Sequence, residues 1–415
     1  MTSVITGIGM LAATGIGTEA LWEAVREGRP GIKQISRFDA TGYGGGLGGE
    51  ITEFDAATWV ESRVLVQTDL WTHLALAATK MALDDARLDP AATDDPYAVG
   101  VTTSASSGGN IFGQREIHSL WSQGPRHVGP YQSIAWFYAA CTGQMSIAHG
   151  AKGPCGVIAT EAAGGLDALA HSRRVIRRGT PAMITGGTEA PLGPYALVCQ
   201  LAGGLLSRTA QLADAYAPFT TRACGYVPGE GGAVLVLEDS QAARQRDATA
   251  IAEISGWGAA FAGRVPAGAH DHAGWAKTTP ALARAIRAAL ADARIDATDI
   301  SMVFADGVGI PHADAAEAAA LHAALGAHAA SVPVALPKAG FGRLHAGSAT
   351  IDTALAALAL RDGVVPPAPG INDPDPALGL RLVTGEARTV QGRHALVVSR
   401  GTGGFASALV LSRTT

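Results

Sequence analysis

Cysteine is scarce in this sequence. Its 415 residues contain only Cys141, Cys155, Cys199 and Cys224, which lie far apart and form neither a Cys-x-x-Cys pair nor a Cys/His ligand spacing. Neither a disulfide framework nor a zinc site is therefore expected, and no metal is predicted. We expect all four cysteines to be buried as small hydrophobic side chains.

Other absences narrow the function. No segment reaches about 18 uninterrupted apolar residues, and the N-terminus lacks a basic region followed by an apolar stretch. Neither membrane spanning nor export is indicated, and a cytoplasmic location is expected. The net charge is −5 and like charges form no long run, so the sequence predicts no positively charged surface that would attract nucleic acid. A role in small-molecule metabolism is more natural.

An internal repeat indicates a duplicated fold. Residues 82–89 read Ala-Leu-Asp-Asp-Ala-Arg-Leu-Asp, and residues 289–296 read Ala-Leu-Ala-Asp-Ala-Arg-Ile-Asp. Each copy ends an alanine- and leucine-rich stretch with helical spacing, over 71–88 and 280–295. Each is followed by a short apolar run that is typical of a buried strand, at 98–101 and 302–305.

Later segments complete each predicted half. Apolar runs at 183–187 and 395–399 each follow a long helix, and runs at 233–237 and 408–411 close each sheet. With 47% hydrophobic and 16% charged residues, the chain can bury a large core of about two to three units. We place the two halves at 1–249 and 250–415.

Several motifs carry a resemblance to a known family. They are the opening strand with its glycine turn at 4–10, Pro218-Phe219, the segment Gly-Tyr-Val-Pro-Gly-Glu-Gly-Gly at 225–232, and Lys-x-x-x-Gly-Arg-Leu at 338–344. The chain resembles the β-ketoacyl synthases of the thiolase-like superfamily. More specifically, it resembles the chain-length factor, or ketosynthase-beta subunit, of bacterial type II polyketide synthases. The resemblance implies an α/β fold of five layers, α-β-α-β-α, built from two duplicated halves.

The resemblance also locates a catalytic centre whose chemistry is missing. Ala162 stands where an active ketosynthase carries its nucleophilic cysteine, so no thiolate can form. Asp306 and Arg343 replace the two histidines that assist decarboxylation, while Lys338 is retained. An anion at Asp306 opposes enolate stabilisation, and Arg343 is better suited to an ion pair than to proton transfer. Many chain-length factors have glutamine at the cysteine position, so any role of that glutamine is absent too.

The positive function is expected between residues 110 and 144. By resemblance, Asn110, Gly113 and Ile117 form the floor of the acyl tunnel, and their small volume predicts a longer polyketide than the shortest aromatic class. Aromatic side chains of this region are expected at the interface with a catalytic ketosynthase, with ordinary core packing as an equal alternative for two of them, Trp136 and Phe137. These interface candidates are Trp121, Tyr131, Trp136 and Phe137.

Further expectations concern partners. Arg173, Arg174 and Arg177 end the helix that begins near Ala162, where cations favour the helix dipole and could also dock an acyl carrier protein. Thr402 replaces the gating phenylalanine of ketosynthases. His312 and His345 lie near the lost positions without matching the family's histidines. No cofactor of its own is expected, since acyl chains arrive on the phosphopantetheine of the carrier protein.

The predicted function is thus that of a non-catalytic subunit that pairs with a cysteine-bearing ketosynthase and sets polyketide chain length. One alternative is a diverged acyltransferase or malonyl-carrier-protein decarboxylase acting alone through Asp306, Lys338 or Glu161. Another is a structural homodimer that does not affect chain length. Turnover by the isolated chain and substitutions at the tunnel floor distinguish these hypotheses.

Overall fold

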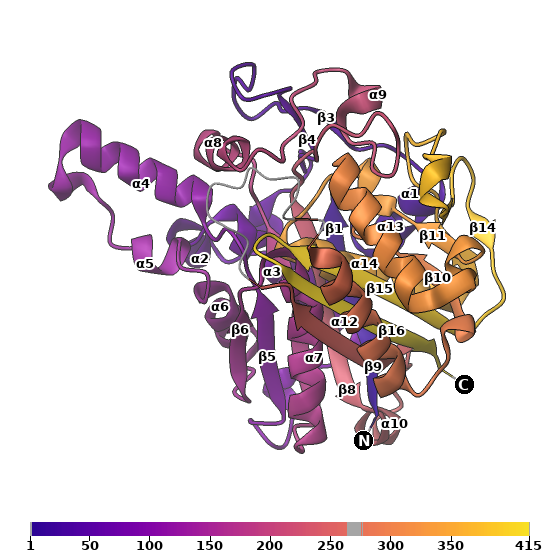
Figure 1. The fold of residues 1–415 in the computed structure, drawn as a ribbon. Helices are drawn as coiled ribbons and strands as arrows, with labels where there is room; N and C mark the ends of the chain where they lie inside the picture. The colour runs from indigo at the N-terminus through magenta and orange to yellow at the C-terminus, as the bar shows by residue number, and fades with distance from the viewer. Residues whose placement is uncertain (1, 264–274, 276, 415) are drawn as a thin grey trace.

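The computed structural model describes residues 2–263, 275 and 277–414. Two β-sheets, joined by hydrogen bonds between one strand of each, form separate layers with helices on both faces of each (Figure 1). The purple segments of the first half lie on the left of the view and the orange and yellow segments of the second half mostly on the right, while the indigo start of the chain reaches the top and right. The strand-helix-strand repeat predicted from the sequence is therefore confirmed, and the architecture is the five-layer α/β arrangement expected for the thiolase-like fold.

The first half begins at the N-terminus and carries one of the two large sheets and a small two-stranded sheet. Its elements, with η marking a 3₁₀ helix, are β1 (Ser3–Ala12), β2 (Gly15–Ile16), α1 (Thr18–Arg26), β3 (Lys33–Gln34), β4 (Leu47–Gly48), η1 (Ala56–Thr58), α2 (Ser62–Gln67), α3 (Leu70–Ala86), η2 (Pro90–Ala92), β5 (Val99–Ser104), α4 (Asn110–Gln123), η3 (Pro125–His127), α5 (Gln132–Ala135), α6 (Ala140–His149), β6 (Cys155–Ile158), η4 (Glu161–Ala163), α7 (Gly164–Arg177), β7 (Ala182–Glu189), α8 (Pro194–Ala202), α9 (Leu212–Ala215), β8 (Gly231–Asp239) and α10 (Ser240–Gln245).

The second half repeats the scheme. Its elements are β9 (Ala252–Phe261), α12 (Thr278–Ala293), η5 (Ala297–Asp299), β10 (Ile300–Phe304), α13 (Pro311–Leu325), η6 (Gly326–Ala330), β11 (Pro333–Ala335), η7 (Pro337–Gly340), α14 (Ala346–Asp362), β12 (Val364–Val365), η8 (Pro376–Leu378), β13 (Arg381–Leu382), β14 (Arg388–Thr389), β15 (His394–Gly401) and β16 (Phe405–Arg413). The chain passes from one sheet to the other through residues 246–251, and the predicted boundary at 249/250 falls in this passage.

The two sheets touch at their inner strands. In the described part of the chain the hydrogen-bonded order is β13-β11-β10-β15-β16-β9-β1-β8-β7-β5-β6, with β2 paired to β1. Only the start of β1 pairs with the start of β9, through Val4 with Glu253 and Ile5 with Ala252. Helices α7 and α14 pack between the two sheets, α3 covers the outer face of the first sheet and α12 that of the second. These are the five layers.

The repeated segments end in the same way in both halves. Helices α3 and α12 stop at Arg87 and Arg294, which both take the left-handed conformation, with φ of 51° and 57°. The next aspartate in each half stands just before a 3₁₀ turn: the Asp89 carboxylate accepts from the Ala91 N–H at 3.0 Å, and the Asp296 N–H donates to the Asp299 carboxylate at 2.8 Å. The duplication therefore extends to the caps, and both helices end two residues before the sequence predicted.

Glycines in the first strand of each half let the outer helix approach the sheet. A Cβ atom at Gly9 of β1 would lie 1.9 Å from the Ala78 carbonyl oxygen of α3, and one at Gly258 of β9 would lie 2.2 Å from the Ala285 oxygen of α12. Both are impossible contacts, so only glycine permits this packing. The expected glycine turn at 4–10 is wrong, because these residues lie inside the continuous strand β1.

An arm leaves the body of the molecule at α4. In Figure 1 this helix projects from the first half, and the chain returns through η3 and α5. The returning segment is held against α4 by a hydrogen bond from the Gly129 N–H to the Glu116 carboxylate. At the base, the Asp69 carboxylate accepts from the Phe112 N–H at 2.5 Å. In the described residues no helix is long and apolar enough to cross a membrane.

Candidate functional site: the lost catalytic centre

Ala162 lies at the N-terminal end of α7. It sits in the 3₁₀ turn η4, is fully buried, and is separated from the first residue of α7, Gly164, by Ala163 alone. Gly165 allows close packing, since a Cβ atom there would lie 2.9 Å from the Ala349 side chain of α14. The helix dipole that would activate a nucleophile is thus in place, but its end faces only a methyl group.

The neighbouring residue, Glu161, points a carboxylate into the same region. Its backbone has φ of 52°, a strained conformation for glutamate. One carboxylate oxygen lies 3.1 Å from His345 Nδ1, and the other accepts from the Thr402 N–H at 2.9 Å. Burial alone would raise the pKa of Glu161, but the His345 hydrogen bond and the charge of Arg343 lower it to about 2. The Glu161 carboxylate is therefore ionised, and both of its oxygens already have hydrogen-bond partners.

His345 is held from both sides. It immediately precedes α14 with φ of 46°, and its Nε2 atom lies 3.1 Å from Gln200 Oε1. The Gln200 side-chain nitrogen already donates to the carbonyl oxygens of Pro191 and Ala196, which fixes its oxygen toward His345 and toward the Tyr226 hydroxyl. Sequence reasoning missed this network, because no short-range pattern links Glu161, Gln200 and His345.

Asp306 and Arg343 form a buried ion pair. Arg343 Nη1 lies 3.0 Å from Asp306 Oδ1, and both side chains are shielded from solvent. Arg343 also donates to the Arg400 carbonyl oxygen at 3.0 Å. Burial acts to lower the pKa of Arg343, but the carboxylates of Asp306 and Glu161 raise it. The guanidinium is therefore a permanent charge and not a base.

Further buried charges extend this pair. Arg400 reaches the second Asp306 oxygen at 3.3 Å and Glu317 at 2.6 Å. Lys338 forms an ion pair with Asp352 and donates to the carbonyl oxygens of Ala305 and Asp306 at 2.9 and 3.2 Å. The cluster thus matches three cations with three carboxylates, and its charges are compensated internally.

The chemical consequence follows from these contacts. The site holds no nucleophile at Ala162, and the positions of the two expected histidines are filled by a salt bridge. The Thr402 N–H, which could otherwise stabilise an oxyanion, donates to Glu161 instead. The paired charges therefore fill the former catalytic site with a stable arrangement that does not support acyl transfer.

The predicted tunnel-floor residues share one face of α4. Asn110 and Gly113 are buried at its base, while Ile117 lies further along the arm and is 43% exposed. The Asn110 amide nitrogen is buried and has no hydrogen-bond partner within the described residues. A buried donor without a partner is costly, and the side-chain oxygen of Gln132 in α5 is likewise buried without a partner within the described residues.

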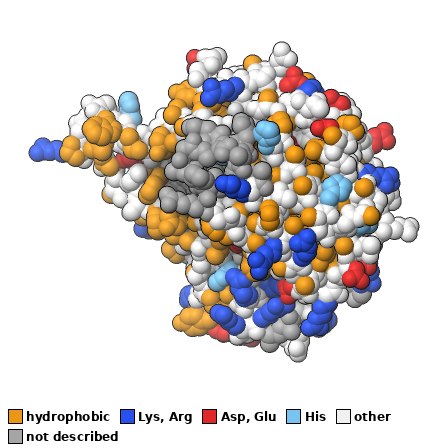
Figure 2. Space-filling view, viewed as in Figure 1, with side chains coloured by type: hydrophobic (Ala, Val, Ile, Leu, Met, Phe, Trp, Pro, Cys, Tyr) orange, Lys and Arg blue, Asp and Glu red, His pale blue; other side chains and the backbone are white. Residues whose placement is uncertain are grey.

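The aromatic residues of the arm are exposed. Trp121 is 83% exposed, Trp136 47% and Phe137 42%, while Tyr131 is half-buried. In the space-filling view, hydrophobic side chains gather on the arm and at its base (Figure 2). The alternative that Trp136 and Phe137 are ordinary core residues is therefore wrong for the single chain, in which both side chains are exposed.

Comparison with known proteins places the chain in a family. The β-ketoacyl synthase N-terminal domain matches residues 3–243 and the C-terminal domain matches residues 251–372. In Streptomyces halstedii, a putative polyketide β-ketoacyl synthase 2 is 50% identical, over 99% of this chain and 97% of its own length. Synthase 1 of the same organism, with the same coverage, is only 33% identical. The chain belongs to the chain-length factors, the ketosynthase-beta subunits of type II polyketide synthases.

Other relatives agree with this placement of the chain-length factor. The ketoacyl synthase beta subunit of the tetracenomycin polyketide synthase from Streptomyces glaucescens is 49% identical, over 99% of this chain and 98% of that protein. A solved type II ketosynthase in complex with its acyl carrier protein superimposes with a TM-score of 0.87 at 26% identity, covering 100% and 99% of the two chains. The ishigamide ketosynthase/chain length factor reaches 0.88 at 24% identity, covering 100% and 99%, and supports the fold.

Two expectations for the chain-length factor need correction. Arg173 is not free to dock a carrier protein, because it is buried, paired with Asp292 and bonded to the Ser255 carbonyl oxygen. Arg174 and Arg177 of the same helix remain exposed, with Arg174 stacked 5.2 Å from the Trp257 ring.

The cysteine expectation is wrong for three of the four residues. Cys141 is buried on α6, where burial raises the pKa of its thiol. Cys155, Cys199 and Cys224 are exposed, because they lie on the edge strand β6, on the surface helix α8 and in the loop before β8.

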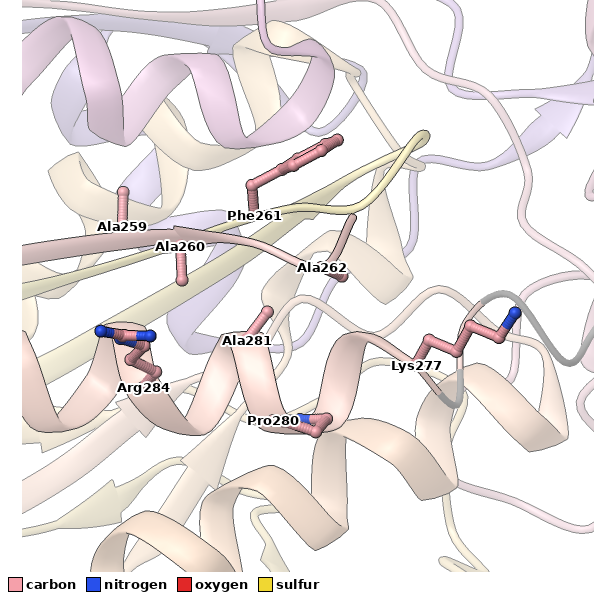
Figure 3. A pocket seen from close by; sticks show the side chains of 8 residues that line it. All are labelled: Ala259, Ala260, Phe261, Ala262, Lys277, Pro280, Ala281 and Arg284. Atoms are coloured by element: carbon pink, nitrogen blue, oxygen red, sulfur yellow. The ribbon is translucent and has the colours of Figure 1, made fainter. Parts of the chain in front are cut away.

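A separate cavity of about 540 Å³ lies between β9 and α12. Figure 3 shows Lys277 and Arg284 of this helical region at its two ends, with Phe261 and small side chains along it. None of the predicted site residues lines it.

Among the residues that the structure describes, no group of three His, Cys, Asp or Glu side chains could hold a metal ion.

Proposed function

We propose that this chain is the non-catalytic half of a heterodimer with a cysteine-bearing ketosynthase, in which it shapes the acyl tunnel and sets the number of malonyl extensions. The observation that carries the proposal is the replacement of the whole catalytic set by Ala162 and the buried Asp306–Arg343 pair. The chain keeps the architecture of a ketosynthase but fills its reactive centre with fixed charges. Carbon–carbon bond formation then belongs to the partner.

The exposed arm supports the choice of partner. A single chain that leaves large aromatic side chains such as Trp121 in solvent is expected to bury them in a permanent complex. The solved structural relatives include a ketosynthase bound to its acyl carrier protein. We therefore infer that acyl chains reach the complex on the phosphopantetheine of a carrier protein, and that Arg174 and Arg177 offer cations to that acidic partner.

A copurification assay tests the proposal. The chain is co-expressed with the ketosynthase encoded beside its gene, purified through a tag on this chain only, and assayed with malonyl carrier protein. A one-to-one complex that makes polyketide, and that loses activity when the partner's cysteine is replaced, supports the proposal. Turnover of malonyl carrier protein by this chain alone would instead identify it as an acyltransferase or decarboxylase in its own right.

Chain-length control is the second part of the proposal. Asn110, at the buried base of α4, is a position where added bulk would shorten the space for the acyl chain. Asn110→Phe is expected to shorten the product, and Asn110→Ser, which keeps a small polar group, is the matched control. Unchanged product length with an active Phe variant would favour a purely structural subunit. We also propose a cytoplasmic location, which cell fractionation of the producing organism tests.

A further inference from the structure

Gly113 does not face empty space. A Cβ atom built at this position would lie 3.0 Å from Trp136 Cδ1, and 3.7 Å from both Cγ and Nε1 of the same ring. The pyrrole edge of the indole therefore rests on the backbone of α4. Any residue larger than glycine would meet the Trp136 ring in this conformation.

The backbone around Trp136 is fixed in this place. The Gly109 N–H donates to the Trp136 carbonyl oxygen at 3.2 Å, and Trp71 Nε1 donates to the Ala135 oxygen at 3.3 Å. Glycine is also required at the contact, since a Cβ atom at Gly109 would lie 2.0 Å from the Ala135 oxygen. The backbone that carries the indole is thus held in place, and the ring itself lies against Gly113.

One side of Trp136 rests on α4 and the rest of the side chain is half open. At 47% exposure it is far more covered than Trp121, which lies at the tip of the same arm. Gly113 belongs to the face of α4 that also carries Asn110 and Ile117. The ring is therefore next to the surface that the proposed function assigns to the tunnel floor.

We propose that Trp136, seated on Gly113, supplies the bulk that ends the acyl tunnel in this chain-length factor. This inference rests on the proposed function and deepens it. The space beside Gly113 is then already occupied by the Trp136 ring. The volumes of the side chains at 110, 113 and 117 therefore do not by themselves determine how deep the tunnel is. The ligand is the distal end of a growing poly-β-keto acyl chain, which is stopped by the indole.

The test compares product length across substitutions in the purified heterodimer. Trp136→Ala is expected to lengthen the product by at least one two-carbon unit, and Trp136→Phe to lengthen it less. Gly113→Thr should perturb assembly or product length through collision with the ring. The double variant Gly113→Thr/Trp136→Ala should return toward the parent length, because threonine takes the vacated space. Products are identified by mass after single incubations with malonyl carrier protein.

Tyr97→Ala is the matched control, since it removes an aromatic ring that is 66% exposed, lies outside the arm and does not contact Gly113. It is expected to leave product length unchanged. An active Trp136→Ala or Trp136→Phe complex with the parent product length overturns the inference while leaving the proposed function intact. If the parent pair makes no polyketide at all, it is the proposed function that fails.

Discussion

Replacing Arg343 by methionine should destabilise the chain strongly. The substitution keeps an unbranched side chain but removes the guanidinium 3.0 Å from Asp306. Asp306 would then retain only Arg400 at 3.3 Å, and Arg400 already pairs with Glu317 at 2.6 Å. The Asp306 carboxylate would then stay buried with only one of its two cationic partners.

The magnitude follows from the burial of both partners. Asp306 is fully buried and Arg343 is 3% exposed. Removing one partner of such a pair costs about 3–5 kcal/mol, whereas removing both charges is often close to neutral. We therefore expect Arg343→Met and Asp306→Asn each to lose about 3–5 kcal/mol, and the double variant to lose less than either.

Urea unfolding followed by tryptophan fluorescence measures these differences. Arg361→Met is a suitable control, because Arg361 is paired with Glu19 and Asp362 at the surface and its loss should cost below about 1 kcal/mol. The reasoning is refuted if the double variant loses the sum of the two single losses. It is also refuted if Arg343→Met is no less stable than Arg361→Met.

Three further outcomes are expected. Because the pKa of Glu161 is lowered to about 2 from an ordinary value of about 4.3, its charge stabilises the fold above about pH 4.3 and this contribution is lost as the pH falls toward 2. Glu161→Gln should lower the free energy of unfolding by about 2–3 kcal/mol at pH 7. In acid unfolding curves this difference from the parent chain should shrink below about pH 4.3. A difference that grows in acid contradicts the reasoning. Ala162→Cys should not acquire acyl groups from malonyl carrier protein when the partner's cysteine is replaced, because the Thr402 N–H already serves Glu161; acyl labelling detected by mass spectrometry would refute it. Arg173→Ala should cost about 2–3 kcal/mol in thermal or urea unfolding, since it removes a buried guanidinium that bonds to the Asp292 carboxylate and the Ser255 carbonyl oxygen. Arg177→Ala removes an exposed side chain and should change stability by less than about 0.5 kcal/mol. Equal losses in the two variants would contradict the burial argument.

The sequence predicted the layers of the fold because they depend on local periodicity. The helices over 71–88 and 280–295 were recognised from alanine and leucine spacing, and α3 and α12 differ from them by two residues at the C-terminal end. The difference arises from Arg87 and Arg294, whose left-handed backbone ends each helix early. Non-glycine residues in this conformation are uncommon, so no propensity argument would have placed the ends there.

The site could be predicted residue by residue but not as a network. Ala162, Asp306 and Arg343 were found by resemblance, yet the contact of Asp306 with Arg400 joins residues 94 positions apart, and that of Glu161 with His345 joins residues 184 apart. Long-range hydrogen bonds leave no periodic signal in one sequence. The same limit explains why Gly113 was interpreted as open space, since Trp136 reaches it from beyond the turn of the arm.

The Asp306–Arg343 pair has a consequence for descent. Replacing either residue alone by histidine removes one partner of a buried charge, so each one-step return to histidine is destabilising. Every path back to an active enzyme crosses an unstable intermediate, even before a cysteine is restored at 162. The buried charges thus act as an evolutionary ratchet that keeps the two subunits of such a synthase specialised.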